Sequence, residues 1–313
     1  MHGVRKVALA AGVVACLVFV STSAWGTAYT IYDRNSTATF EVGAGTPGAK
    51  GGGYDLPGML NWTVEGERFT YNHMYQQWFW YRVGTTGPEQ SIDHLALTAA
   101  VLSDTNGGPP PFPGLPGGDD RPDALTLRYA DDLTAPTFGI ELKYGLSGGM
   151  VGEDGVSDIM EQITIFNLGG STLDFHFFQY TDFDLSESPD DDSAWIVNDN
   201  AVKQVESGEN HLTASETVIL PKPSHYEVAP WDTTLAKLED SLPTTLADVG
   251  GPIFYQDVTW AFQWDFSIPV GGSAQISKDK QLTFAPEPVT AAGLLLSVGC
   301  LARYVRRRRH LHG

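Results

Sequence analysis

The segment Val258–Ile268 constrains the fold of this chain more than any other. Large apolar side chains alternate there with small or polar ones, and the apolar set is Val258, Trp260, Phe262, Trp264, Phe266 and Ile268. A repeat of two residues is the period of a β-strand, because successive side chains point to opposite faces of a sheet. We therefore expect a half-buried strand whose tryptophans face a hydrophobic core.

Further strands are predicted by the same reasoning. Residues 138–146 repeat the alternation, and residues 75–83 are strongly aromatic. Residues 163–167 and 172–185 flank a turn that contains glycine, which favours a hairpin. Within the second arm, residues 175–180 are apolar on both faces, so we expect a central strand buried on two sides.

One short helix is predicted over residues 233–241. A threonine can cap its start, Leu235, Leu238 and Leu242 share a face, and Pro243 ends it. The fold class that follows is all-β: a large antiparallel β-sandwich with one short helix, preceded by a signal peptide and followed by a single transmembrane helix.

The charge balance excludes one class of partner. The chain has 38 acidic residues against 19 lysines and arginines, a formal net charge of -19. Several of the bases lie in the terminal segments, so residues 27–285 are more acidic still. Because a negative field repels phosphate groups, we expect no binding to nucleic acid.

Residues 1–26 predict a signal peptide, since a short basic start is followed by an apolar stretch and then by small residues. The two cysteines, Cys16 and Cys300, lie in the hydrophobic end segments. The expected exported body, residues 27–285, therefore has no disulfide and depends on its own core for stability.

The C-terminal tail joins three features in a fixed order. A rigid acidic tripeptide, Pro286, Glu287 and Pro288, is followed by a largely apolar stretch over residues 289–305. Four arginines come next: Arg306, Arg307, Arg308 and Arg309. The apolar stretch can enter a bilayer as a helix, whereas the arginines stay in the cytoplasm. We expect the body to lie outside the membrane before any processing.

This ordered tail, residues 286–309, resembles the PEP-CTERM sorting signal. The resemblance implies export by the general secretion machinery and then recognition by exosortase, a membrane transpeptidase-like enzyme. It also implies a passage through the inner membrane to the cell surface or extracellular polysaccharide matrix of a Gram-negative-type bacterium. The body would then belong to an uncharacterised family. A permanent single-pass anchor, which needs only the hydropathy, is the alternative.

An acidic segment follows the expected central strand and contains Asp182, Asp184, Asp190 and Asp192. Calcium takes six to eight oxygen ligands, commonly from closely spaced carboxylates. These four residues are therefore candidate calcium ligands, although a solvated acidic loop gives the same pattern. No other cofactor is expected.

No catalytic motif is predicted. Residues 145–149 fit the G-x-S-x-G pattern of a nucleophilic serine, but no helical period follows, so we interpret them as a glycine turn between strands. The expected function is a structural or binding module, not an enzyme, in contact with extracellular polysaccharide. The alternative is a secreted glycan-active enzyme, which needs two carboxylates facing each other across a cleft.

Overall fold

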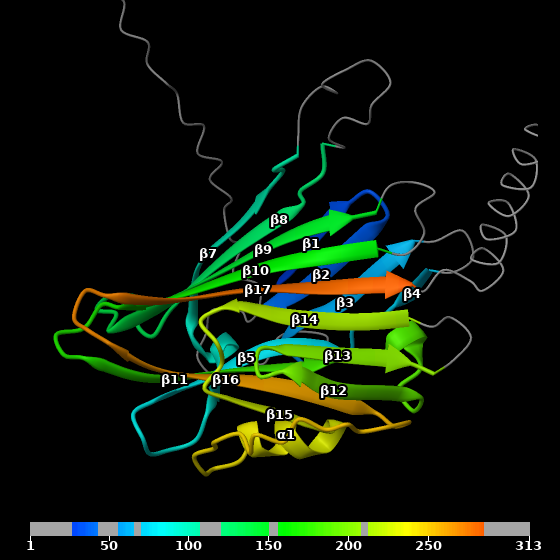
Figure 1. The fold of residues 1–313 in the computed structure, drawn as a ribbon. Coiled ribbons are helices and arrows are strands. Elements are labelled where there is room, and N and C mark those ends of the chain that lie inside the picture. Colours follow the sequence, from blue (N-terminus) through cyan, green and yellow to red (C-terminus); the bar gives the residue numbers. More distant parts are fainter. Residues whose placement is uncertain are drawn as a thin grey trace, which may run out of the picture.

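The computed structural model describes residues 27–42, 56–65, 70–106, 120–149, 156–207 and 212–284. They form two large antiparallel sheets around a shared hydrophobic core (Figure 1). The all-β prediction, with antiparallel sheets, is confirmed. The signal peptide and the tail, residues 1–26 and 286–309, lie outside the described residues. Within those described, no helix has the length and apolar character of a membrane span.

The first sheet has the strand order β1-β2-β3-β5-β11-β16-β15, with β4 paired to β3 and β6 paired to β5. Its strands are β1 (Thr27–Asp33), β2 (Ser36–Val42), β3 (Gly58–Glu65), β4 (Thr70–Asn72), β5 (Gln76–Val83), β6 (Gln90–Ser91), β11 (Leu173–Asp182), β15 (His225–Pro230) and β16 (Val258–Ile268).

The second sheet has the order β12-β13-β14-β17-β10-β9-β8-β7. Its strands are β7 (Ala96–Ser103), β8 (Ala124–Ala130), β9 (Phe138–Gly148), β10 (Val156–Asn167), β12 (Asp192–Asn198), β13 (Ala201–Glu206), β14 (Leu212–Leu220) and β17 (Ser273–Phe284). The described residues also contain the helix α1 (Trp231–Leu238) and two short 3-10 turns, η1 (Ile92–His94) and η2 (Leu185–Glu187).

The strand β11 lies at the centre of the first sheet, as its sequence predicts. It pairs with β16 on one side and β5 on the other, so that Phe177 faces Trp264 in one register and Tyr81 in the other. The Phe177 ring stacks on that of Phe79, with centroids 5.2 Å apart. Trp264 is buried, as the alternation of its strand requires. These aromatic contacts form the centre of the core.

The hairpin predicted for residues 163–185 is wrong. The strand β10 belongs to the second sheet and β11 to the first, so the turn between them carries the chain from one layer to the other. Asn167 holds this crossing, because its Nδ2 donates to the carbonyl oxygens of Ser171 and Ile268, each at 2.8 Å. Both strands bury a face in the same core, so their patterns cannot distinguish a hairpin from a crossing.

The strand β16 is buried on both faces over most of its length, not on one as the alternation predicts. The helix α1 contacts it, and the segment around Thr244 and Leu246 bonds to the first sheet. Leu246 N donates to Gln263 Oε1 at 2.9 Å. Arg82, which forms a buried ion pair with Glu89, donates to the carbonyl of Thr244 at 2.8 Å. The segment after α1 is therefore held to the first sheet by hydrogen bonds to Gln263 and Arg82.

The helix α1 is close to its predicted place but begins earlier and ends earlier. Thr234 does not cap it; its hydroxyl instead donates to Glu227 Oε1 at 2.7 Å. Leu238 is buried as expected, whereas Leu242 lies beyond the helix and is 64% exposed. The helix is therefore fixed by a buried polar contact to β15, which a helical pattern alone does not contain.

Four charged side chains lie in the core between the two sheets. Lys278 and Lys280 of β17 both form ion pairs with Glu161 of β10, and Lys278 Nζ lies 3.3 Å from Glu216 of β14. Glu216 also accepts a hydrogen bond from Trp260 of the opposite sheet at 3.0 Å. Each of the four charged residues is at most 1% exposed. Two positive and two negative charges compensate each other, so the buried group is neutral overall.

Candidate functional site

The candidate site lies at one edge of the first sheet, where four neighbouring strands begin or end. The strand β5 starts directly after Tyr75, β11 ends at Asp182, β16 starts directly after Asp257, and β15 leads into α1 at Trp231. Antiparallel neighbours run in alternate directions, so the start of one and the end of the next meet at the same edge. Residues far apart in the sequence are thereby brought together.

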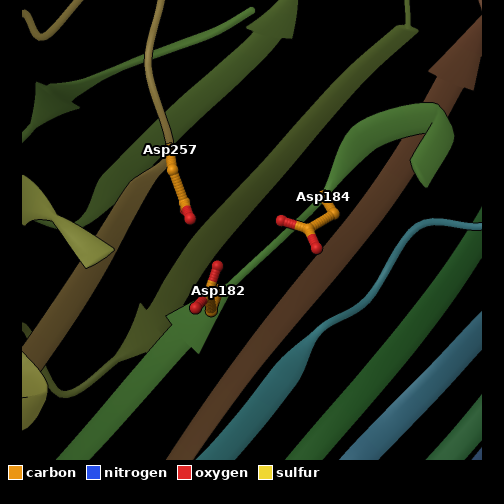
Figure 2. Close-up of side chains that lie close together, drawn as sticks. All are labelled: Asp182, Asp184 and Asp257. Carbon is orange, nitrogen blue, oxygen red and sulfur yellow. The ribbon is translucent and has the colours of Figure 1, made fainter. Parts of the chain in front are cut away.

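Three carboxylates form the centre of this edge. Asp182, Asp184 and Asp257 each offer an oxygen, and these oxygens all lie within 4.8 Å of one another. Figure 2 shows the three side chains pointing toward a common space between the end of β11 and the segment that enters β16. Asp182 is 3% exposed, whereas the other two are half-buried. We call these three residues the acidic site.

The electrostatics of the acidic site disfavour three ionised carboxylates. Burial is the main cause that raises the pKa of Asp182 well above its ordinary value, that of Asp184 to about 6, and that of Asp257. The charges that add to these shifts are all carboxylates, including those of Asp190 and Asp232. The site therefore needs either protons or a positive ligand to compensate its charge.

Two carboxylate oxygens of the acidic site have no partner. Asp182 Oδ2 lies 3.1 Å from the hydroxyl of Tyr180, but Asp182 Oδ1 is shielded from solvent and accepts no hydrogen bond from any described residue. Asp257 Oδ1 is also buried and accepts no hydrogen bond within the described part of the chain. Such buried acceptors are costly, so each requires an explanation.

The backbone carbonyls of the acidic site are already engaged. The carbonyl of Asp182 accepts from Tyr75 N at 3.1 Å, and that of Asp257 accepts from Trp231 N at 3.2 Å. The carbonyl of Asp184 accepts from Glu187 N at 3.0 Å. These bonds fix the backbone around the site.

Four exposed aromatic residues lie close to the acidic residues along the backbone: Tyr75 N donates to the Asp182 carbonyl, Trp231 N donates to the Asp257 carbonyl, and Phe254 and Tyr255 directly precede the segment of Asp257. We call them the aromatic border: Tyr75, Trp231, Phe254 and Tyr255, which are 51%, 51%, 56% and 70% exposed. Among the described residues the only other exposed aromatic is Phe166. The pKa of Tyr75 is raised first by burial and then by the charges of all three carboxylates. Large exposed apolar groups that gather at one place indicate a binding surface.

Tyr255 adds a backbone feature to this border. Its φ is 53°, a left-handed conformation that is uncommon for a bulky residue. The conformation is supported by a hydrogen bond from Tyr255 N to Ser193 Oγ at 3.2 Å. Strained residues of this kind gather at ligand sites, where the surrounding structure holds them in place.

The predicted calcium ligands divide into two sets. Asp182 and Asp184 are both in the acidic site, and Asp182 is the buried end of the central strand as expected. Asp190 is exposed and acts on the site only through its charge. Asp192 is not one of the three clustered carboxylates, and its Oδ2 accepts from Leu185 N at 3.2 Å and from Gln204 Nε2 at 2.6 Å.

Asp257 was not predicted as a site residue. It is a single acid before a strand, and its role depends on the pairing of that strand with β11. A correct register would have placed it beside Asp182, so pairing was the missing signal. The predicted sorting residues, Pro286 to Pro288 and Arg306 to Arg309, lie outside the described residues.

The G-x-S-x-G segment does not form a nucleophile elbow. Ser147 is an exposed residue within β9, paired with Asp158 of β10. Gly145 and Gly148 are strand residues too, so the expected turn between strands is also wrong at these positions. Gly148 is needed because the turn after β1 approaches it closely: a Cβ there would lie 2.1 Å from the carbonyl oxygen of Asp33.

Comparison with models of known protein families and with curated proteins finds no match. Among solved structures, the chain is similar to a bacterial glucoamylase complexed with acarbose, at 11% identity and a TM-score of 0.47, covering 90% of this chain and 35% of that one. It is similar to a protein from the human microbiome assigned as a kojibiose phosphorylase, at 10% identity and a TM-score of 0.45, covering 90% and 36%.

A third similar structure is a protein of Escherichia coli K12 assigned as an aldose 1-epimerase, at 9% identity and a TM-score of 0.49, covering 83% of this chain and 99% of that one. The chain thus spans about a third of the first two proteins and nearly all of the third. We expected that the body is not an enzyme. The comparison contradicts this expectation, because the proteins with a similar fold are named as carbohydrate-active enzymes. At these identities the similarity concerns the fold, and no activity passes from those proteins to this chain.

Proposed function

We propose that the protein is glycan-active and that it binds a polysaccharide at the acidic site and the aromatic border. The observation that carries this function is the presence of exposed aromatic residues on the same segments as three clustered carboxylates, with the charges of all three acting on Tyr75. A sugar ring has an apolar face, which packs on an aromatic ring, and hydroxyl groups, which donate to carboxylates. The edge offers both kinds of contact side by side.

The charge of the protein selects among glycans. The formal net charge is -19, and the acidic site is bordered by further carboxylates at Asp190 and Asp232. A polysaccharide rich in uronate or sulfate would be repelled by this field. The preferred ligand is therefore a neutral glycan, in which recognition depends on ring faces and hydroxyl groups.

Delivery outside the cell is part of the same proposal. The signal peptide, residues 1–26, and the PEP-CTERM-like tail, residues 286–309, would bring the acidic body to the cell surface or polysaccharide matrix with the help of exosortase. Mass spectrometry of the exported protein tests this, and the expected mature form lacks both segments. A mature form that retains residues 289–313 would support the permanent anchor instead.

A polysaccharide panel tests glycan activity. The full-length protein should bind at least one neutral glycan, and Tyr75→Ala should weaken that binding about tenfold or more, because a ring contact is lost. The matched control is Phe166→Ala, which removes an aromatic that is 37% exposed on β10 of the other sheet. Equal losses in the two variants, or no binding by the parent protein, would refute the assignment of the site.

Chemical change of the bound glycan is measured in the same experiment. New reducing ends should appear with the parent protein and should fall at least tenfold with Asp184→Asn. Asp184 is suited to this comparison because its side chain is half-buried and lies outside the hydrophobic core, so we expect the variant to fold. Product formation at an undiminished rate in the variant would show that the acidic site does not perform the chemistry.

A further inference from the structure

The acidic site has the features of a cation site rather than those of a solvated acidic surface. A solvated cluster keeps its oxygens in water, whereas Asp182 is 3% exposed and its Oδ1 is buried without a hydrogen-bond partner among the described residues. Asp257 Oδ1 is likewise buried and unpartnered within that part of the chain. Both oxygens belong to side chains that Figure 2 shows turned toward the same space.

We propose that Asp182, Asp184 and Asp257 bind one calcium ion. Their oxygens lie within 4.8 Å of one another, which is the span that a single ion with ligands at about 2.3–2.6 Å can bridge. Hard oxygen ligands of irregular arrangement are typical of calcium, whereas magnesium requires near-octahedral geometry and retains its water. The ion would supply the positive charge that this group of carboxylates lacks.

The number of protein ligands leaves part of the calcium shell open. The three backbone carbonyls of the site are already hydrogen-bonded, and Asp182 Oδ2 contacts Tyr180. The carboxylates alone therefore provide fewer oxygens than the six to eight that calcium takes. Water or sugar hydroxyl groups would fill the remaining positions. This last role rests on the glycan function proposed above, whereas ion binding itself does not.

Calcium titration of the purified chelator-treated protein, without any glycan, tests the ion site. Isothermal titration calorimetry should show one ion per chain, with a Kd of about 1 mM or tighter, as is usual for extracellular modules. Calcium should also raise the melting temperature, because a ligand that binds only the folded state stabilises it. Magnesium at the same concentration should bind at least tenfold more weakly.

Three variants test whether calcium binds at the acidic site or is attracted only by the general negative charge of the surface. Asp184→Asn and Asp257→Asn should each weaken calcium at least tenfold, and both positions are half-buried, so folding is expected to persist. Asp182→Asn should do the same and is informative if the variant folds. The control Glu239→Gln removes an exposed charge after α1 and should change the Kd less than twofold. Equal weakening by the control, or no saturable binding at 10 mM calcium, would overturn the site.

The glycan experiments are repeated with and without calcium to keep the two proposals apart. Calcium binding without glycan binding would refute the glycan function and leave the ion site standing. Glycan binding that is unaffected by a chelator, in a protein that binds no calcium, would refute the ion site alone. Glycan binding that falls at least tenfold on chelation, and returns with calcium, would support both.

Discussion

The hydroxyl of Tyr180 lies 3.1 Å from Asp182 Oδ2 and also 3.0 Å from the carbonyl oxygen of Trp231. Burial raises the pKa of Asp182 well above its ordinary value. A phenol has only one hydrogen, so it cannot donate to both acceptors at the same time. Tyr180 therefore shares its single hydrogen between these two acceptors, in a short chain of hydrogen bonds from Asp182 to Trp231. This chain joins the end of β11 to the first residue of α1.

Replacing Tyr180 by phenylalanine should break that connection. We expect the free energy of unfolding of Tyr180→Phe to fall by about 1–3 kcal/mol, because buried groups on both sides lose a partner. Urea denaturation followed by tryptophan fluorescence measures this. The control is Tyr226→Phe on β15, a half-buried tyrosine, for which the loss should be smaller. Equal losses at the two positions would show that the hydroxyl of Tyr180 has no special role.

The buried charges of the core give a second prediction. In Lys278→Met, Glu161 and Glu216 would share only Lys280, which leaves one buried negative charge uncompensated. The free energy of unfolding should fall by about 3–5 kcal/mol. The control Lys222→Met removes an ion pair with Asp199 in which both side chains are more than half exposed, and it should cost less than about 1 kcal/mol. A similar small loss in both variants would contradict the importance of the network.

The sequence predicts the elements whose patterns are local. The alternation of Val258–Ile268 gives the bounds of β16, and the two-sided apolar pattern of residues 175–180 gives the central place of β11. The tryptophans Trp260 and Trp264 are buried, as that alternation requires. In each case the side chains of a single strand contain the information, because they alone decide which face is buried.

The remaining features depend on partners from other strands. Lys278 and Lys280 alternate with Ser277 and Asp279, so β17 appears polar on both faces, although both lysines are buried. Their burial is possible only because glutamates of β10 and β14 compensate their charge. The acidic site is similar: two of its three carboxylates, Asp182 and Asp184, can be predicted from the segment after β11, whereas Asp257 joins them through strand pairing. Such compensation cannot be deduced from one segment.

Gly148 provides a third prediction, which concerns the close approach of two segments. In Gly148→Ala the new Cβ would lie 2.1 Å from the carbonyl oxygen of Asp33, so the backbone of β9 or of β1 must move. We expect a loss of about 2 kcal/mol or more in the free energy of unfolding, as is usual for overpacking. In Gly170→Ala the Cβ would meet nothing within 4 Å, so stability should change little or rise slightly. Thermal or urea unfolding of the two variants distinguishes these cases.

Asp192 gives a prediction about pH. Burial is the main cause that raises its pKa from 3.8 to about 8. Between these values the folded protein retains a proton that the unfolded chain has lost. The resulting stabilisation is complete below the unfolded pKa, falls as the pH rises, and is lost above about 8. In Asp192→Asn this titration is absent, so the unfolding free energy should decline less with rising pH, by up to about 1.4 kcal/mol per pH unit.

Urea denaturation at several pH values between 5 and 8 measures that difference in slope. The folded state also lowers the pKa of Glu216 and Glu227, which favours stability at higher pH, but both residues are present in the parent and the variant. Their effect therefore cancels when the two proteins are compared. The control Asp199→Asn removes a half-exposed carboxylate and should follow the parent slope. If Asp192→Asn also followed the parent slope, Asp192 would have to be ionised in the folded protein, and its unpartnered Oδ1 would need another explanation.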